Sequence, residues 1–269
     1  KINAVSPNYA SELLTHLGAH GMASVFQQRA SDLRGILNGC DYQDWDPAFD
    51  PLLPATYDAD NLDGKHTCKR ILQQETGLPV GNLPIYGMVC RLTEQKGVHL
   101  LIPALDKFLQ HQVLVVIVGS GDPSLAAQLQ SIAQQHPDKF AFINAYDDRL
   151  AHLVEAGADF FLMPSLFEPC GLNQMYSLAY GTLPLVRAVG GLKDTVVDWD
   201  ADPTHATGFC FNDPTASTLL DAMRRSLLHY LQEPARFARV QHHAMNTRFD
   251  WADSVILYEQ MYQDALATV

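Results

Sequence analysis

The chain has 269 residues, and 47% of them are hydrophobic, which is enough to bury the core of one large globular domain with a small appendage. A formal net charge of −12 argues against nucleic acid as a partner, because binding to a phosphate backbone depends on clustered Lys and Arg. A membrane-spanning segment is also not expected, since the most apolar segments, such as Val113 to Val118, have only the length of a strand.

Cysteine usage points to a reducing compartment. The five cysteines are odd in number and widely spaced, and no two form a CxxC pair. This pattern argues against a disulfide framework and against a zinc site, so we expect a cytoplasmic protein without a metal or a cofactor. The chain begins at Lys1 without an initiator Met or a signal pattern, and we therefore expect it to start inside a longer protein.

The first part of the chain indicates short elements followed by a loop. Lys1 to Val5 is typical of a strand, Gly21 to Leu33 of a helix, and Arg34 to Leu37 of a short strand that ends in the turn Asn38-Gly39. Residues 41–57 are rich in Asp and Pro and predict a loop.

From about residue 84, apolar β-branched runs alternate with amphipathic helical stretches, which is typical of a parallel sheet covered by helices. The fold class is therefore α/β, with a doubly wound, Rossmann-like parallel sheet. The predicted strands are Ile85 to Val89, Leu114 to Val118, Ala141 to Ile143, Phe160 to Met163 and Leu183 to Val186. In such a sheet the ligand binds beyond the carboxyl ends of the strands, so the residues that follow each strand are the candidates for function.

Two cations follow the first of these strands. Arg91 and Lys96 flank a turn that opens a helix, and such a turn suits a diphosphate because Arg can bind two phosphate oxygens while Lys adds a point charge. The alternative is a solvated turn with two surface cations, which is the commoner meaning of an isolated RxxxxK.

The residues that follow the next two strands are weaker indicators of function. The turn Gly119-Ser120-Gly121 predicts tight strand-to-helix geometry, with Asp122 or Pro123 beginning the helix. Tyr146 follows the third strand and could stack on a base, although core packing is the default for such a Tyr.

The most informative segment follows the strand Phe160 to Met163. It sets Glu168 beside a Pro, with a Gly at the start of the helix Leu172 to Ala179. Backbone amides at that helix start could hold a phosphate, and Glu168 would project into the same crevice. A carboxylate near phosphates suits a sugar, through its hydroxyls or through positive charge at its anomeric carbon; the alternative is that Glu168 only caps the helix.

The last predicted strand is followed by the paired glycines Gly190-Gly191, for which phosphate contact and a simple tight turn are both open. Downstream of Pro214 the pattern becomes helical, with Ser217 to Leu231, Pro234 to Asn246 and Trp251 to Ala267, the last opening with Asp250 as N-cap.

Taken together, five motifs in this order and at these separations resemble the glycogen and starch synthases that use ADP-glucose (glycosyltransferase family 5), the bacterial glycogen synthases in particular. The motifs are RLTxQKG, GxGDP, PSxFEPCGLNQ, YGTLPLVR and VGGLxDTV, and the early SPxYA and NGxD segments also fit. The resemblance covers essentially all of the chain, and EPCGLNQ followed by YGTLPLVR is its most specific part.

The resemblance implies a GT-B fold, in which two Rossmann-like domains face each other across a cleft and the C-terminal domain holds most of the nucleotide. Arg91 and Lys96 would then hold the diphosphate, Tyr146 would stack against adenine, and Glu168 would face the glucose. We count Glu168, Arg91 and Lys96 as candidate catalytic residues. The other candidate substrate-binding residues are Asn38, Cys170, Gly171, Leu172, Asn173 and Gly190. Cys170 could alternatively be a reactive thiol.

The resemblance also implies domain boundaries. Residues 1–20 would end the N-terminal domain and cross over, residues 21–247 would form the nucleotide-sugar-binding domain, and residues 248–269 would pack back towards the N-terminal domain. The family's KxGGL loop and glucose-contacting His are not found in this sequence. We therefore expect them in an N-terminal domain outside the chain.

The function implied is transfer of glucose from ADP-glucose to the nonreducing end of an α-1,4-glucan, with retention of configuration and without a metal. This chain would be the donor-binding half and inactive alone. One alternative is a related retaining glycosyltransferase with another donor, such as UDP-glucose, or another acceptor. A second alternative is a noncatalytic nucleotide- or glucan-binding module.

Overall fold

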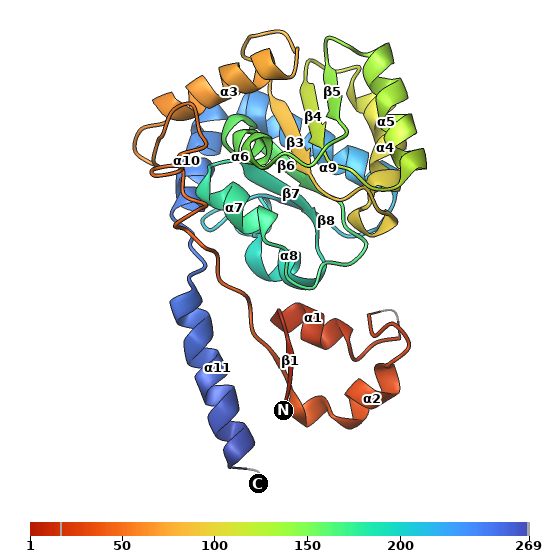
Figure 1. Cartoon of the computed structure of the whole chain (residues 1–269), viewed down its shortest axis with the longest axis vertical. Helices are drawn as coiled ribbons and strands as arrows, with labels where there is room; N and C mark the ends of the chain where they lie inside the picture. Colours follow the sequence, from red (N-terminus) through yellow and green to blue (C-terminus); the bar gives the residue numbers. More distant parts are fainter. Residues whose placement is uncertain (17, 268–269) are drawn as a thin grey trace.

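The computed structural model describes residues 1–16 and 18–267, which form a large α/β domain and a smaller unit beside it (Figure 1). The large domain is built on a six-stranded sheet with the order β5-β4-β3-β6-β7-β8, in which every neighbouring pair is parallel. The strands are β3 (Ile85–Val89), β4 (Leu114–Val118), β5 (Phe140–Ile143), β6 (Phe160–Met163), β7 (Leu183–Arg187) and β8 (Phe209–Phe211). The chain runs outwards from β3 to β5 and then returns to place β6 beside β3. The topological switch point, where such sheets bind ligands, therefore lies between β3 and β6.

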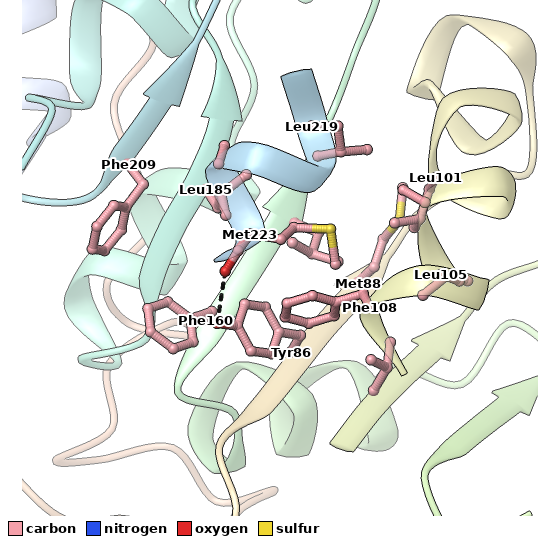
Figure 2. Close-up of a cluster of buried hydrophobic side chains, with 14 of the residues drawn as sticks. Tyr86, Met88, Leu101, Leu105, Phe108, Phe160, Leu185, Phe209, Leu219 and Met223 are labelled. Carbon is pink, nitrogen blue, oxygen red and sulfur yellow. Dashed lines mark hydrogen bonds between the residues drawn. The ribbon is translucent and has the colours of Figure 1, made fainter. Parts of the chain in front are cut away.

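Both faces of the sheet are buried, which explains why its strands are continuously apolar. Val115 and Ile117 of β4 face one hydrophobic cluster, while Leu114 and Val116 face the other, as the alternation of side chains along a strand requires. Figure 2 shows part of the first cluster, in which Tyr86 stacks on Phe160 with ring centroids 4.5 Å apart. The predicted α/β class and doubly wound parallel sheet are thus confirmed.

Helices cover each face of the sheet. Residues of α4 (Val98–Phe108), α5 (Pro123–Gln135), α9 (Ala216–Gln232) and α10 (Pro234–Met245) pack into the first cluster. Residues of α3 (Asp63–Glu75), α6 (Asp148–Gly157), α7 (Asn173–Ala179) and α8 (Gly190–Thr195) pack into the second. Within residues 1–16 and 18–267, no helix is both long enough and apolar enough to cross a membrane.

The predicted strands of the sheet are all present, but one strand and one helix of the large domain were not predicted. β8 is only three residues long and lies at the edge of the sheet, so it has little periodicity to detect. The buried face of α3 includes Lys65 and Gln73 beside Cys68 and Leu72. These two polar residues interrupt the apolar pattern by which an amphipathic helix is recognised.

The Asp-rich segment 41–57 contains no helix or strand, as predicted. Three of its four aspartates form local turns, because their side chains accept a hydrogen bond from the backbone amide two residues later, as Asp41 does from Gln43 and Asp46 does from Ala48. Asp50, which is 1% exposed, also fastens this loop to the large domain. Its Oδ2 lies 2.7 Å from His152 Nδ1 and accepts a hydrogen bond from the Tyr180 hydroxyl at 2.6 Å.

We expect Asp50→Ala to lower the free energy of unfolding by about 3 kcal/mol, because each buried polar group left unsatisfied costs about 1–3 kcal/mol. Burial alone would raise the pKa of Asp50, but hydrogen bonds from His152, Tyr180 and the Leu52 amide outweigh it and hold the pKa below its usual value. A lowered pKa stabilises the fold above the unfolded value of about 3.9 and loses that contribution as the pH falls through the folded pKa. Urea unfolding at pH 7 and near pH 3 should therefore show the difference between wild type and variant shrinking in acid.

The matched control for Asp50 is Asp44→Ala, since Asp44 is an exposed aspartate of the same loop. It should change the free energy of unfolding by less than about 0.5 kcal/mol. Equal effects of the two substitutions would contradict a fastening role for Asp50.

The smaller unit contains residues 1–16 and 18–35. β1 (Ile2–Ala4) pairs in parallel with β2 (Leu33–Gly35), and α1 (Pro7–Glu12) and α2 (Ala23–Gln28) lie between them in the chain. The predicted helix Gly21 to Leu33 is thus shorter, and α2 is followed by a 3₁₀ turn over Ala30–Asp32. Residue 17 of the predicted segment 1–20 lies outside the described residues.

The C-terminal helix α11 (Trp251–Leu266) leaves the large domain and runs beside the smaller unit (Figure 1). Asn3 Nδ2 donates to the Tyr258 hydroxyl at 2.9 Å, and Ser254 Oγ donates to the Leu37 carbonyl at 2.7 Å. Asp250 precedes the helix as predicted, although its side chain makes no capping hydrogen bond. Residues 268 and 269 of the predicted segment 248–269 lie outside the described residues.

Candidate active site

Two adjoining cavities lie at the carboxyl ends of the central strands. The first, of about 280 Å³, lies between β3 and β6 at the topological switch point, and the second, of about 220 Å³, lies at the ends of β3 and β4. The two share Val89, Cys90 and Asn173. Of the candidate site residues, Lys96, Glu168, Gly171, Leu172 and Asn173 line the first cavity, and Arg91, Tyr146 and Asn173 line the second.

A buried carboxylate is anchored by one of its two oxygens in the first cavity. Glu168 is 6% exposed, and its Oε2 accepts a hydrogen bond from Lys96 Nζ at 2.6 Å and from Ser165 Oγ at 3.0 Å. Its Oε1 accepts no hydrogen bond from the described residues. The pair with Lys96 offsets the cost of burying the charge, and Oε1 remains available to a ligand. Lys96 is therefore an ion-pair partner of Glu168 as well as a cation that lines the first cavity.

Arg91 and Tyr146 both line the second cavity. Arg91 is exposed, and its guanidinium has no hydrogen-bond or ion-pair partner in the part of the chain that the structure describes. Tyr146 is 89% exposed, which is opposite to the default of core packing. A free cation and an open aromatic face can bind a phosphate and a planar base.

The glycine turn after β4 lies behind this second cavity. A Cβ at Gly119 would come within 2.0 Å of the Cys90 carbonyl oxygen, so glycine is required for the turn to approach the end of β3. The predicted start of the next helix is confirmed, because Asp122 caps α5 by accepting from the amides of Ser124 and Leu125, and Pro123 is its first residue.

The segment between β6 and α7 presents backbone donors to the first cavity. Among the described residues, no group accepts a hydrogen bond from the amides of Gly171, Leu172 or Asn173. Gly171 has a φ of +70°, and Asn173 Nδ2 donates to the Val89 carbonyl at 3.1 Å, which ties α7 to the end of β3. The alternative that Glu168 caps this helix is not seen, since α7 begins at Asn173 without a side-chain cap.

Gly190 does not line either cavity. Its amide donates to Glu12 Oε1 at 2.8 Å, so the donor that could have met a phosphate already has a carboxylate partner. Glu12 belongs to α1, which is separated from Gly190 by most of the chain, and no local pattern could have predicted this contact.

Cys170 and Asn38 also lie away from the cavities. Cys170 packs with Cys40 and Met175 in a small apolar cluster. Burial raises the pKa of the Cys170 thiol, which disfavours the reactive thiolate considered from the sequence. Cys170 thus belongs to the apolar core beside the loop that carries Glu168.

The sequence analysis missed Ser165, the second donor to Glu168. Its signal was present, because Ser165 lies in the same turn after β6, three residues before the carboxylate.

Among residues 1–16 and 18–267, no group of three or more His, Cys, Asp or Glu side chains could hold a metal ion.

The chain is similar to known proteins over almost its whole length. Residues 70–240 match the family described as "Glycosyl transferases group 1". A glycogen synthase of Aeromonas hydrophila is 86% identical over 267 residues, which is 99% of this chain and 55% of that protein. A glycogen synthase of Vibrio parahaemolyticus is 61% identical over 269 residues, which is 99% of this chain and 56% of that protein.

A solved structure with the same fold contains a nucleotide. It is the catalytic domain of starch synthase IV from Arabidopsis thaliana bound to ADP and acarbose, which is 35% identical with a TM-score of 0.93 and covers 98% of this chain and 55% of that one. The GT-B fold predicted from the motifs is thereby confirmed, and the chain spans about half the length of the curated relatives it matches. Because residues 70–240 match this family, the chain belongs to the group 1 glycosyl transferases.

Proposed function

We propose that this chain is the donor-binding half of a glycogen synthase, which transfers glucose from ADP-glucose to the nonreducing end of an α-1,4-glucan with retention of configuration. The observation that carries the proposal is the pair of adjoining cavities, one holding Glu168 with Lys96 and the other Arg91 with Tyr146. The identity to relatives named glycogen synthase supports the reaction, and the ADP in the starch synthase structure supports the nucleotide.

Each of the two cavities would hold a different part of the ADP-glucose donor. Adenine would stack on the exposed ring of Tyr146, and the free guanidinium of Arg91 would hold the diphosphate as it passes from the second cavity to the first. The amides of Gly171, Leu172 and Asn173 would complete the phosphate contacts. The glucose would then lie in the first cavity, beside Oε1 of Glu168.

The chemistry separates charge along the donor. As the bond from the anomeric carbon to the phosphate oxygen breaks, its electron pair leaves with ADP and the sugar becomes cationic. Arg91 and Lys96 stabilise the departing diphosphate, and Glu168 stabilises the cationic sugar. The acceptor's 4-hydroxyl oxygen then bonds to the same face of the anomeric carbon and gives its proton to the departing phosphate oxygen, which retains the configuration.

The remaining components would come from outside this chain. We propose that an N-terminal domain of the same protein supplies the KxGGL loop and the glucose-contacting His and closes over the donor, and that it binds the glucan acceptor with this domain. The exposed apolar side chains of α11, among them Ile256 and Tyr262, would pack against that domain. All five cysteines are free, which fits the cytoplasm as the place of action.

We expect the isolated chain to bind ADP weakly, with a dissociation constant of about 0.1–1 mM, and to transfer no measurable glucose, because half of the cleft is absent. Titration calorimetry should show Arg91→Ala weakening ADP binding about tenfold through the loss of a charge-assisted contact. The matched control is Lys107→Ala, which removes an exposed cation at the far end of α4. Absence of heat at millimolar ADP, or equal affinity in wild type and Arg91→Ala, would contradict the donor site.

Two other functions are separated by simple additions to that experiment. Tighter binding of UDP than of ADP would favour a related glycosyltransferase with a UDP-sugar donor. A full-length protein that binds ADP-glucose without forming a longer glucan would favour a noncatalytic module. The anchored Glu168, with one oxygen free in the cavity, favours an enzyme.

A further inference from the structure

Helix α8 connects the smaller unit to the loop that carries Glu168, which is residues 164–172 and is called the donor loop below. On one side, the Gly191 amide donates to the Glu168 carbonyl oxygen at 3.0 Å. On the other side, the Gly190 amide donates to Glu12 Oε1 at 2.8 Å, and Asp194 Oδ2 accepts from the Asn8 amide at 2.8 Å. Each of the two helices α1 and α8 therefore supplies one carboxylate to a backbone amide of the other.

The contact between α8 and the donor loop leaves no free space. A Cβ at Gly190 would lie 1.8 Å from the Glu168 carbonyl oxygen, and a Cβ at Gly191 would lie 2.0 Å from the Cys170 carbonyl oxygen. The two backbones are thus in direct contact over three residues of the loop. A displacement of α8 would move the backbone of Glu168 with it.

The carboxylate of Glu12 is itself held in place. Asn8 Nδ2 donates to the same Glu12 oxygen at 2.6 Å, so one Oε1 joins the side chain of Asn8 to the amide of Gly190. A second contact from the smaller unit reaches the same loop, because the His20 ring meets Phe167 edge-on with centroids 4.9 Å apart. The smaller unit therefore contacts the donor loop both through α8 and directly.

We propose that Glu12 is a positioning residue for glucose transfer. Glu12 fixes the position of Glu168 through α8. This inference rests on the proposed function of Glu168 in sugar transfer. A carboxylate that accepts from a backbone amide makes a stronger contact than a neutral acceptor, and it fixes the start of α8 against α1. Groups that face a reacting carbon must be held to within a fraction of an ångström, so the place of α8 controls the rate rather than donor affinity.

The test uses the full-length protein with ADP-glucose and a glucan acceptor. We expect Glu12→Ala to lower kcat about tenfold, since a displacement of 1 Å can cost up to about a hundredfold. The KM for ADP-glucose should change less than about twofold, because Glu12 does not line either cavity. Glu12→Gln should recover most of the rate, because its amide oxygen can still accept from Gly190 and Asn8.

Hydrogen exchange measured on residues 188–195 gives a readout independent of activity. Faster exchange at Gly190 and Gly191 in Glu12→Ala, with an unchanged unfolding midpoint, would support the coupling. An unchanged kcat, an equal loss in Glu12→Ala and Glu12→Gln, or a higher KM with normal kcat would overturn it. An inactive wild type would contradict the proposed function instead, and exchange at residues 188–195 would then still decide whether Glu12 positions α8.

Discussion

Glu168→Gln in the full-length protein is expected to lower kcat for glucosyl transfer by about 10²–10³-fold, the usual cost of losing one preorganised electrostatic contact to a transition state. Glutamine has nearly the shape of glutamate and its amide oxygen can still accept a hydrogen bond from Ser165 Oγ, so the loop should keep its structure. The charge that faces the cationic sugar is lost. A radiolabelled ADP-glucose assay with a glucan acceptor measures the effect.

The same substitution should not weaken the binding of ADP, although it slows the transfer of glucose. Glu168 holds Lys96 at 2.6 Å, and a neutral side chain would release that ammonium group towards the diphosphate while removing a repulsive carboxylate. We therefore expect Glu168→Gln to bind ADP at least as tightly as the wild type in calorimetry. The combination of slower transfer and undiminished binding distinguishes a role in chemistry from a role in donor binding.

Glu94→Gln provides the control for charge. Glu94 is exposed and lies only two residues before Lys96, so the same charge is removed near the site without altering the cavity. Its kcat should stay within about twofold of the wild type. Comparable losses in the two variants, or full activity in Glu168→Gln, would show that Glu168 does not act on the sugar.

The sequence was sufficient to predict the sheet because parallel strands covered on both faces have a simple signature. Val115, Val116 and Ile117 are all buried, and an uninterrupted apolar run of this length has few other meanings. The positions that follow these strands predicted that Arg91, Tyr146 and Glu168 lie at one edge of the sheet, and the structure places them in two adjoining cavities there. Local pattern and topology were enough for these residues.

Contacts between distant segments could not be predicted in this way. The ion pair between Lys96 and Glu168 depends on how closely two turns approach, and the bond from Gly190 to Glu12 crosses between two units of the molecule. Gly190 illustrates the difficulty. Its position after a strand suggested a free backbone donor at a helix start, but in the structure that donor is buried and its partner is a carboxylate 178 residues earlier.

Gly97→Ala is expected to destabilise the large domain strongly and to separate Lys96 from Glu168. Gly97 has a φ of +72°, which costs a non-glycine residue about 1–2 kcal/mol. A Cβ there would also lie 2.0 Å from the Pro164 carbonyl oxygen, a contact that can be relieved only by moving the turn after β3 away from the turn after β6. We expect the free energy of unfolding to fall by about 3–5 kcal/mol in total, as for other overpacked buried sites.

Gly77→Ala separates the two causes. Gly77 has almost the same φ, +73°, but a Cβ there would meet nothing within 4 Å. This variant should lose only the conformational term of about 1–2 kcal/mol and should bind ADP as the wild type does. Urea unfolding and ADP calorimetry on both variants then measure the steric contact by difference. If Gly77→Ala and Gly97→Ala were equally destabilised and bound ADP equally well, the close approach of the two turns would not be what holds Lys96 against Glu168.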